Sequence, residues 1–223
     1  MMRFCILVLM IMSCLAANPW RSDARELFIT DSLDRLYHLT GDGETIRLTE
    51  SRYAATYYTM SSGEDWVGYK DFTPALETRN ELQQNLYLYR PIDRAVIIVE
   101  ENTAQVGLPA FGQQYIAYFK DKTLRILDRQ SCQPILDCPL GEFANLIAFQ
   151  PGREDCLAWT DYQGQVVIYN WKTGERKLLT ISSGREGYQP IWSPDGSHLL
   201  VPTVEGSLAL INPAKPSSST LMP

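Results

Sequence analysis

The sequence predicts an all-β protein built from short antiparallel strands. The 223-residue chain is rich in strand-forming aromatic residues, with 12 Tyr, 7 Phe and 5 Trp, and in turn-forming residues, with 14 Gly and 13 Pro. Its short apolar segments also recur at nearly regular spacing. The hydrophobic fraction of 45% is that of a globular protein, and the length fits one large domain or two small ones.

The charge balance argues against a nucleic-acid partner. Lys and Arg number 20 against 26 Asp and Glu, which gives a formal net charge of −6. Proteins that bind nucleic acids normally need a basic surface to displace counterions from the phosphates. We therefore expect a partner of another chemical class.

Residues 1–17 have the pattern of a secretory signal peptide. Arg3 supplies a positive charge, an uncharged apolar stretch runs from Phe4 to Met12, and small residues follow. The uncharged run ends at Pro19, which makes it shorter than the roughly 20 residues that a membrane span needs. We expect export to the periplasm or the outer cell surface.

Cys14 leaves the processing of this segment open. Cys14-Leu15-Ala16 can be cleaved as a small-x-small site. Alternatively, Ile11-Met12-Ser13-Cys14 resembles the lipobox of bacterial lipoproteins, in which Cys14 would become the lipidated first residue and anchor the chain. In a third interpretation Cys14 is only a small residue of the signal peptide.

Three cysteines remain in the exported part of the chain, at Cys132, Cys138 and Cys156. An oxidising compartment permits a Cys132–Cys138 disulfide that closes a short hairpin loop, and the alternative is free, buried thiols. Three cysteines without a nearby histidine do not match a tetrahedral zinc site. We expect no metal and no cofactor.

A repeat of about 41 residues organises the rest of the chain. Segments that begin at Ile116, Leu157 and Leu199 align at offsets of 41 and 42 residues, and earlier copies begin at Trp66 and Leu27. An inserted loop or short helix over residues 73–84 explains the one longer offset. Each copy contains four short strands separated by turn residues, which is the layout of a β-propeller blade.

The strands also predict burial on both faces. Val96–Val99, Val166–Tyr169 and Leu199–Val201 are continuous apolar runs, whereas a sandwich or barrel strand would alternate. We therefore expect a single propeller domain of five blades over residues 23–216, with residues 217–223 as a tail that adds a short strand or frays. The first unit lacks its first strand, so pairing of the terminal strands would close the ring; part of a larger, open array is the alternative.

The segment Ile191-Trp192-Ser193-Pro194-Asp195-Gly196-Ser197-His198-Leu199-Leu200-Val201 resembles the repeat motif of the TolB-like, WD40-like (PD40) β-propellers. Ala148–Trp159 is similar to a degenerate copy, Ile168–Glu175 to the third strand and its turn, and Arg47–Thr49 to the end of the fourth strand. The resemblance covers residues 27–212. It implies a partner among the proteins of the cell envelope.

Patterns that carry catalysis are scarce. The sequence contains no Gly-x-Ser-x-Gly elbow, no dinucleotide-binding fingerprint and no P-loop. His38 and His198 stand apart from other metal-ligating residues. We expect a non-enzymatic protein.

Two sets of residues allow both a functional and a structural interpretation. Asp31, Asp71, Asp121 and Asp161 recur at the end of the equivalent strand, where they could form an acidic ring for a cation or basic partner, or cap turns. The aromatic residues Tyr53, Tyr57, Tyr58, Trp66 and Tyr69 could line a binding surface or fill the core between blades. Asp195 is expected to hold its own turn through local hydrogen bonds.

The leading hypothesis is a monomeric, exported propeller that binds another envelope or secreted protein. It would touch a membrane only through a lipid on Cys14. The alternative is a ligand- or glycan-binding or hydrolytic propeller that uses its central channel. That alternative requires two or more carboxylates to converge on the axis.

Overall fold

A computed structural model describes residues 27–31, 35–49, 58–63, 65–73, 83–179, 189–203, 205–215 and 220–222. All regular structure in these residues is β, arranged as five antiparallel sheets, which confirms the predicted all-β class and the blade count. The predicted signal peptide and Cys14 lie outside the described residues. Within them, no helix has the length and apolar character to cross a bilayer.

The sheets are numbered 1 to 5 in chain order. Sheet 1 contains β1 (Leu27–Thr30), β2 (Leu36–Leu39) and β3 (Thr45–Arg47), and sheet 2 contains β4 (Tyr58–Met60), β5 (Val67–Thr73), β6 (Gln83–Arg90) and β7 (Ala95–Thr103). Sheet 3 contains β8 (Ala110–Phe111), β9 (Tyr115–Lys120), β10 (Thr123–Asp128) and β11 (Pro134–Pro139). Sheet 4 contains β12 (Ile147–Gln150), β13 (Arg153–Thr160), β14 (Val166–Asn170) and β15 (Arg176–Leu179), and sheet 5 contains β16 (Ile191–Trp192), β17 (Leu199–Pro202), β18 (Leu208–Ile211) and β19 (Thr220–Met222).

The 41-residue repeat corresponds to one sheet. Its aligned segments fall on the second strands β5, β9, β13 and β17, and the first copy falls on β1. Sheet 1, as described, therefore starts at the position of a second strand, as the sequence predicts. Tight turns join the strands: Gly164 and Gly196 have φ values of 73° and 69°, a region that glycine enters without strain.

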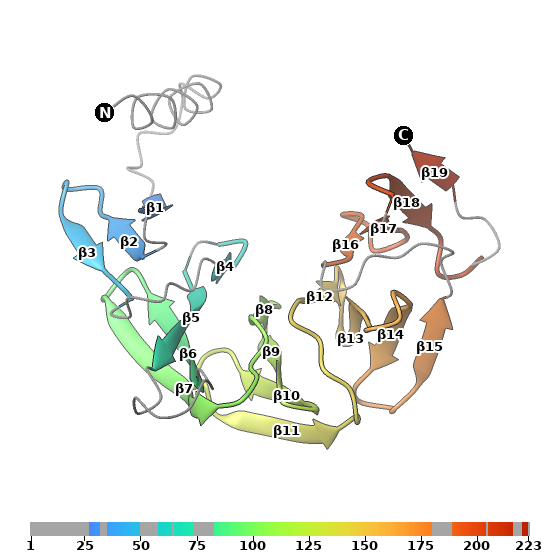
Figure 1. Ribbon diagram of the computed structural model, residues 1–223, viewed down its shortest axis with the longest axis horizontal. Helices are drawn as coiled ribbons and strands as arrows, with labels where there is room; N and C mark the ends of the chain where they lie inside the picture. The colour runs from blue at the N-terminus through green and yellow to red at the C-terminus, as the bar shows by residue number, and fades with distance from the viewer. Residues whose placement is uncertain are drawn as a thin grey trace.

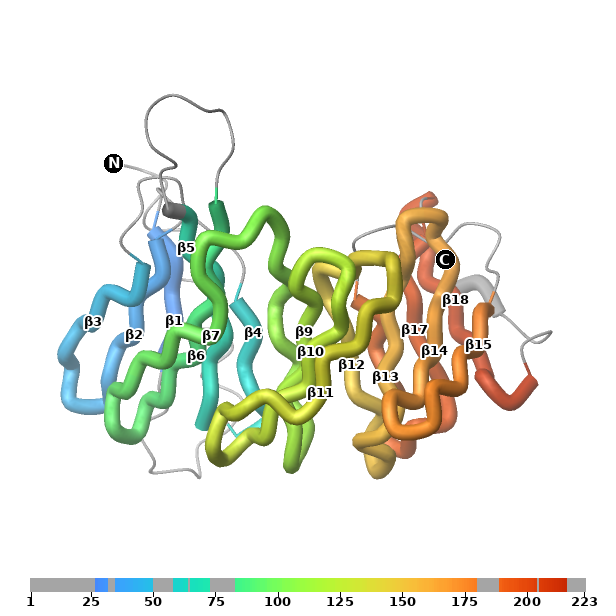
Figure 2. The backbone as a smooth tube through the Cα atoms, turned by 90° about the horizontal axis from the view of Figure 1, so that it is seen from below, coloured from blue at the N-terminus to red at the C-terminus, as the bar shows by residue number. Residues whose placement is uncertain are grey.

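The sheets follow one another around an arc (Figure 1). The first strands β4, β8, β12 and β16 lie on the inner side of this arc, and the last strands β3, β7, β11 and β15 lie on the outer side. Figure 2 shows the same sheets side by side, with their strands running across the thickness of the arc. This is the radial arrangement of propeller blades.

The predicted ring closure does not form. In the described part of the chain β1 pairs only with β2 and β19 pairs only with β18, and sheets 1 and 5 lie at opposite ends of an open arc (Figure 1). The reason lies in the tail. Thr220–Met222 forms β19, which completes the four strands of sheet 5 instead of reaching sheet 1.

Apolar clusters fill the spaces between neighbouring sheets. The cluster between sheets 3 and 4 is centred on Trp159, which is fully buried and packs edge-on against Phe119 with 5.3 Å between ring centroids. The second-strand run Cys156–Thr160 is buried throughout, as expected for a sheet covered on both faces. The run Val96–Val99 differs, because Val96 and Ile98 are each 50% exposed on the outermost strand β7.

Candidate functional site

One face of the arc collects two turns from each complete sheet. In a four-stranded antiparallel meander, the turn between the first and second strands lies at the same sheet edge as the turn between the third and fourth strands. In sheets 2 to 4 these are the β4–β5, β6–β7, β8–β9, β10–β11, β12–β13 and β14–β15 turns, and sheet 5 adds the β16–β17 turn. We call the surface that they form the hairpin face; it is the lower edge in Figure 2.

Three neighbouring pockets form a row on the hairpin face, and we call this row the hairpin groove. A cavity of about 580 Å³ lies between sheets 2 and 3, one of about 700 Å³ between sheets 3 and 4, and one of about 450 Å³ between sheets 4 and 5. The first two share Gln113, Gln114 and Tyr115 in their walls. The second and third share Gln150 and Arg153. The three pockets of the groove therefore lie side by side across four sheets.

Two arginines, each paired with an aspartate, line the first pocket. The Arg90 guanidinium lies 5.3 Å from the centroid of the Trp66 ring and donates hydrogen bonds to Asp93. Arg129 donates to the carboxylate of Asp65, at 2.5 Å, and so joins sheet 3 to sheet 2. Burial alone would raise the pKa of Asp65, but the hydrogen bond from Ser61 and the charge of Arg129 lower it. Asp65 therefore stays ionised beside its arginine.

The middle pocket combines aromatic rings with a lysine. Tyr115 and Trp171 meet edge-to-face with 5.1 Å between centroids. Lys172 Nζ lies 5.6 Å from the Tyr115 ring and 5.2 Å from the Trp171 ring. The Trp171 indole donates to the main-chain oxygen of Glu154 at 2.7 Å, which fixes the ring that Lys172 covers. A cation over aromatic rings is a pre-assembled feature for recognising a partner.

Glu154 joins sheets 3 and 4 beneath this pocket. Its carboxylate accepts the main-chain N–H groups of Gln113 and Gln114, the latter at 2.9 Å. A Cβ added to Gly112 would lie 2.7 Å from the Glu154 carboxylate, so a larger residue at this turn would displace that side chain. The Glu154 charge is thus turned toward backbone donors. The exposed cations of the middle pocket are Lys172 and Arg153, whose side chain is 58% exposed and whose guanidinium lies 3.4 Å from the Asp155 carboxylate.

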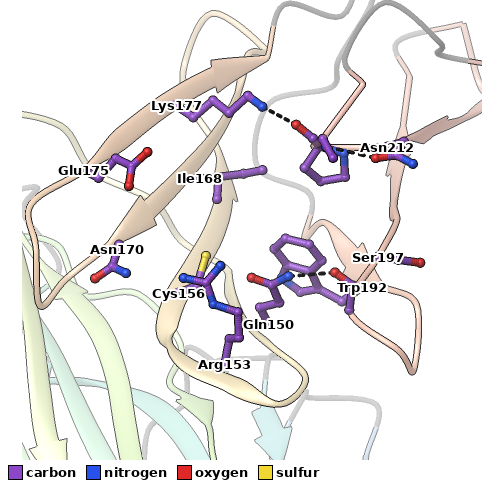
Figure 3. A pocket seen from close by; sticks show the side chains of 13 residues that line it. Gln150, Arg153, Cys156, Ile168, Asn170, Glu175, Lys177, Trp192, Ser197 and Asn212 are labelled. Carbon is purple, nitrogen blue, oxygen red and sulfur yellow. Dashed lines mark hydrogen bonds between the residues drawn. The ribbon is translucent and has the colours of Figure 1, made fainter.

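The third pocket lies between sheets 4 and 5 (Figure 3). Gln150 Nε2 donates to the Gly196 oxygen at 2.7 Å, and Lys177 Nζ donates to the Pro213 oxygen. These two contacts bridge the sheets at the two ends of the pocket, and Trp192 lies between them (Figure 3). This end of the groove has rigid walls because both sheets are tied across it.

Asp195 has the local role predicted for it. Its carboxylate accepts from Ser193 Oγ at 2.5 Å and from the Ser197 amide at 3.0 Å. The hydrogen bonds from the side chain of Ser193 and from Ser197 lower the pKa of Asp195 to about 2. The carboxylate therefore holds the β16–β17 turn.

The inner side of the arc holds a different cavity, of about 400 Å³. Its lining side chains are uncharged: Thr59, Met60, Pro109, Ala110, Phe111, Ala148, Phe149 and Gln189. The channel hypothesis needs two carboxylates that converge near the axis, and the residues that line this cavity in the described chain do not supply them. This cavity therefore does not support the hypothesis of a ligand- or glycan-binding or hydrolytic channel.

The recurring aspartates do not form a ring. Asp31 accepts from the Arg35 side chain and amide, and Asp161 accepts from the amides of Gln163 and Gln165, both within turns. Asp121 accepts from the Gln105 amide and has a φ of 50° in its turn. Asp71 instead lies inside β5. Among the described residues no group of three or more His, Cys, Asp or Glu could hold a metal ion.

The predicted aromatic group divides between core and groove. Tyr69 packs in the cluster between sheets 1 and 2, with Tyr58 at its margin. Trp66 packs between sheets 2 and 3 and lines the first pocket. Tyr53 and Tyr57 lie outside the described residues. Sequence reasoning missed Tyr115, Trp171 and Arg129, although the repeat places Arg129 and Trp171 at the same position, one residue after the third strand.

Of the two alternatives for the cysteines, the structure has the free thiols and not the Cys132–Cys138 disulfide. Cys132, Cys138 and Cys156 are all free. Cys132 lies in the β10–β11 turn and packs between sheets 2 and 3, whereas Cys138 lies near the far end of β11 and packs against the cluster between sheets 3 and 4. An extended strand separates the two thiols, and a disulfide requires Cα atoms within about 7 Å.

The two histidines are structural, as expected. His38 is fully buried, stacks on Phe28 with 4.7 Å between centroids, and has Nδ1 2.8 Å from Tyr89 Oη. His198 Nδ1 lies 2.7 Å from Ser197 Oγ at the β16–β17 turn.

No protein-family model matches the chain, and no curated protein matches it. Solved structures do share its fold. The tricorn protease superimposes with a TM-score of 0.64 at 12% identity over 89% of this chain and 25% of its own, and dihydro-heme d1 dehydrogenase NirN in complex with DHE with a TM-score of 0.62 at 17% identity over 94% and 47%. The Myceliophteria thermophila Cps50 (Swd1) β-propeller domain has a TM-score of 0.59 at 11% identity over 76% and 55%. The chain thus spans less than two thirds of these three proteins, and the likeness establishes the β-propeller fold.

Proposed function

We propose that this chain is an exported, non-enzymatic β-propeller of the TolB-like type that binds another envelope or secreted protein through the hairpin groove. The observation that carries the proposal is the row of three adjacent pockets, which share wall residues across four sheets. Tyr, Trp and Arg are the residues that dominate binding energy in protein interfaces. Tyr115, Trp192 and Arg153 line this groove.

The groove suits an extended segment of a partner protein. Such a segment would place apolar or aromatic side chains against Tyr115 and Trp192, and acidic side chains near Arg153 and Lys172. Opposite charges at the rim favour the correct register and speed association. An acidic-aromatic peptide segment is therefore the chemistry that the groove complements.

Site-specific crosslinking and two matched pairs of substitutions test this proposal. A photocrosslinker replaces Gln114 in the groove, and its control replaces Gln163 in the β13–β14 turn at the opposite sheet edge. The variants Tyr115→Ala and Lys172→Glu are compared with Tyr162→Ala and Lys122→Glu, which lie at that opposite edge and are exposed. We expect one envelope protein to crosslink at Gln114 but not at Gln163, with its yield falling about tenfold or more in Tyr115→Ala and Lys172→Glu. Equal yields in both pairs would contradict the proposal.

Export and anchoring are tested on the amino terminus. Mass spectrometry of the mature protein from cells gives the first residue and any lipid on Cys14. Export predicts the loss of residues upstream of the cleavage site. A mature protein that still begins at Met1 would contradict this part of the proposal.

A further inference from the structure

Each internal sheet has two apolar faces, and each face is covered by a neighbour. On sheet 4, Ile147, Leu157, Trp159, Val167 and Tyr169 face sheet 3, whereas Ala158, Val166 and Leu179, with Ala148 and Ile168 beside them, face sheet 5. The second set packs against Trp192, Leu199, Val201, Ala209 and Ile211 of sheet 5. The interface between sheets 4 and 5 therefore has two different halves. Sheet 4 supplies the first half and sheet 5 supplies the second.

No other described sheet covers the face of sheet 5 that is turned away from sheet 4, and this face repeats the half of the interface that sheet 4 supplies. Leu200 pairs with Leu210 across β17 and β18, as Ala158 pairs with Ile168 across β13 and β14. Leu208 stands opposite Pro202, as Val166 stands opposite Thr160. We call Ile191, Leu200, Leu208 and Leu210 the trailing face. Ile191 is 57% exposed and Leu208 38% exposed.

No other described sheet covers the face of sheet 1 that is turned away from sheet 2, and this face repeats the half of the interface that sheet 5 supplies. Leu27 pairs with Leu39 across β1 and β2, as Leu199 pairs with Ile211. Ile29 pairs with Tyr37, as Val201 pairs with Ala209. We call Leu27, Ile29, Tyr37 and Leu39 the leading face. Leu27 is 39% exposed and the other three are half-buried.

The two faces are thus the complementary halves of an interface that the fold already builds between its own sheets. One chain cannot join them, because they lie at opposite ends of the arc (Figure 1). We infer that two copies of this chain associate head to tail, with the trailing face of each copy on the leading face of the other. The two contacts are equivalent, so the pair is two-fold symmetric and leaves neither face exposed.

The open side of the arc supports this arrangement. Sheets 1 and 5 both border that side in Figure 1. In the proposed pair, a two-fold axis perpendicular to the plane of the figure would place each leading face opposite a trailing face and would keep both hairpin faces on the same side of the assembly. The inference replaces the expectation of a monomer, and it does not depend on what the hairpin groove binds.

Sedimentation over a range of concentrations tests the inference, with one charge placed on each face. Leu208→Glu alters the trailing face and Leu27→Glu the leading face. Leu178→Glu is the control, since Leu178 is 50% exposed on β15 outside both faces. We expect a dimer whose dissociation constant rises about tenfold or more with either face variant, because each buries an unpaired charge, and does not change with the control. Unchanged melting of the face variants at a dilution where all are monomeric shows that they are folded.

Mixing the two face variants distinguishes a head-to-tail contact from other contacts. Each variant keeps the face that the other has lost, so an equimolar mixture recovers one intact contact and associates more tightly than either variant alone. The inference is overturned if the protein stays monomeric at every concentration, if Leu178→Glu weakens association as much as the face variants do, or if only one of the two faces matters. In the last case the contact would join like faces.

Discussion

Glu100 on β7 and Tyr118 on β9 meet across the interface of sheets 2 and 3, where the Tyr118 hydroxyl donates to the Glu100 carboxylate at 2.8 Å. Lys120 Nζ lies 2.7 Å from the other carboxylate oxygen, and Arg125 also donates to the group. The Glu100 side chain is only 3% exposed. Burial, and then the hydrogen bond to Glu100, raise the pKa of Tyr118 well above its usual value. A buried anion thus ties together two adjacent blades.

Glu100→Gln should destabilise the protein by about 3 kcal/mol, because removal of one partner leaves the cations Lys120 and Arg125 without their shared counter-charge. Urea denaturation gives the free energy of unfolding. Glu101→Gln is the control, since Glu101 is the next residue along and is exposed. A loss no larger than that of the control would show that Glu100 does not tie the blades.

Lys70 should make the stability depend on alkaline pH. Its Nζ donates to the Val106 oxygen at 3.0 Å and to Asn145 Oδ1 at 2.9 Å, and burial lowers its pKa from the ordinary 10.5 to about 8. Between pH 8 and 10.5 the unfolded chain holds a proton on Lys70 that the folded chain releases. The unfolded state binds more protons in this window, so the Lys70 contribution to stability increases as pH rises, by up to about 3 kcal/mol.

The free energy of unfolding at pH 8, 9 and 10 measures this contribution. The rise should be present in the wild type and in Lys122→Met, whose lysine is exposed, and absent from Lys70→Met. If all three proteins show the same pH profile, burial does not lower the pKa of Lys70 in the folded protein.

Gly107→Ala should destabilise the protein by about 1 to 3 kcal/mol. A Cβ at Gly107 would lie 2.6 Å from the Ala144 oxygen, a main-chain atom that cannot move alone. At this position the chain segment that connects sheets 2 and 3 contacts the segment that connects sheets 3 and 4. The Leu108 amide of the first segment donates to the Asn145 main-chain oxygen of the second at 2.8 Å. Gly63→Ala is the control, because only the Asp65 side chain lies near. Equal melting temperatures for the two variants would contradict this packing.

Reductant should leave the melting temperature of the exported chain unchanged, because Cys132 and Cys138 are free thiols. Loss of a structural disulfide from a small exported protein typically costs about 2 to 5 kcal/mol. Calorimetry with and without dithiothreitol measures the effect. A clear fall in melting temperature with the reductant would restore the disulfide hypothesis.

The sequence predicted the second and third strands of sheets 3 to 5 well, because apolar runs such as Leu157–Thr160 and Val166–Asn170 are covered on both faces and recur at fixed spacing. It could not predict the open arc, because closure depends on which strand β19 pairs with. The sequence of so short a strand does not specify its pairing partner. The sequence also did not reveal the hairpin groove. Tyr115 and Trp171 are about 56 residues apart in the chain and meet only because consecutive blades stack.

The open arc is tested most directly by a distance between spin labels at Gly41 in the β2–β3 turn and Ala214 after β18, in a chain without native cysteines. The distance is measured at a dilution where sedimentation finds the chain monomeric, so it reports on one copy. Labels at Thr173 and Ala214, in neighbouring blades, give the reference. An open arc predicts a distance from Gly41 to Ala214 that is much longer than the reference distance. A distance equal to the reference would mean that sheets 1 and 5 are neighbours in a closed ring, and it would contradict the open arc.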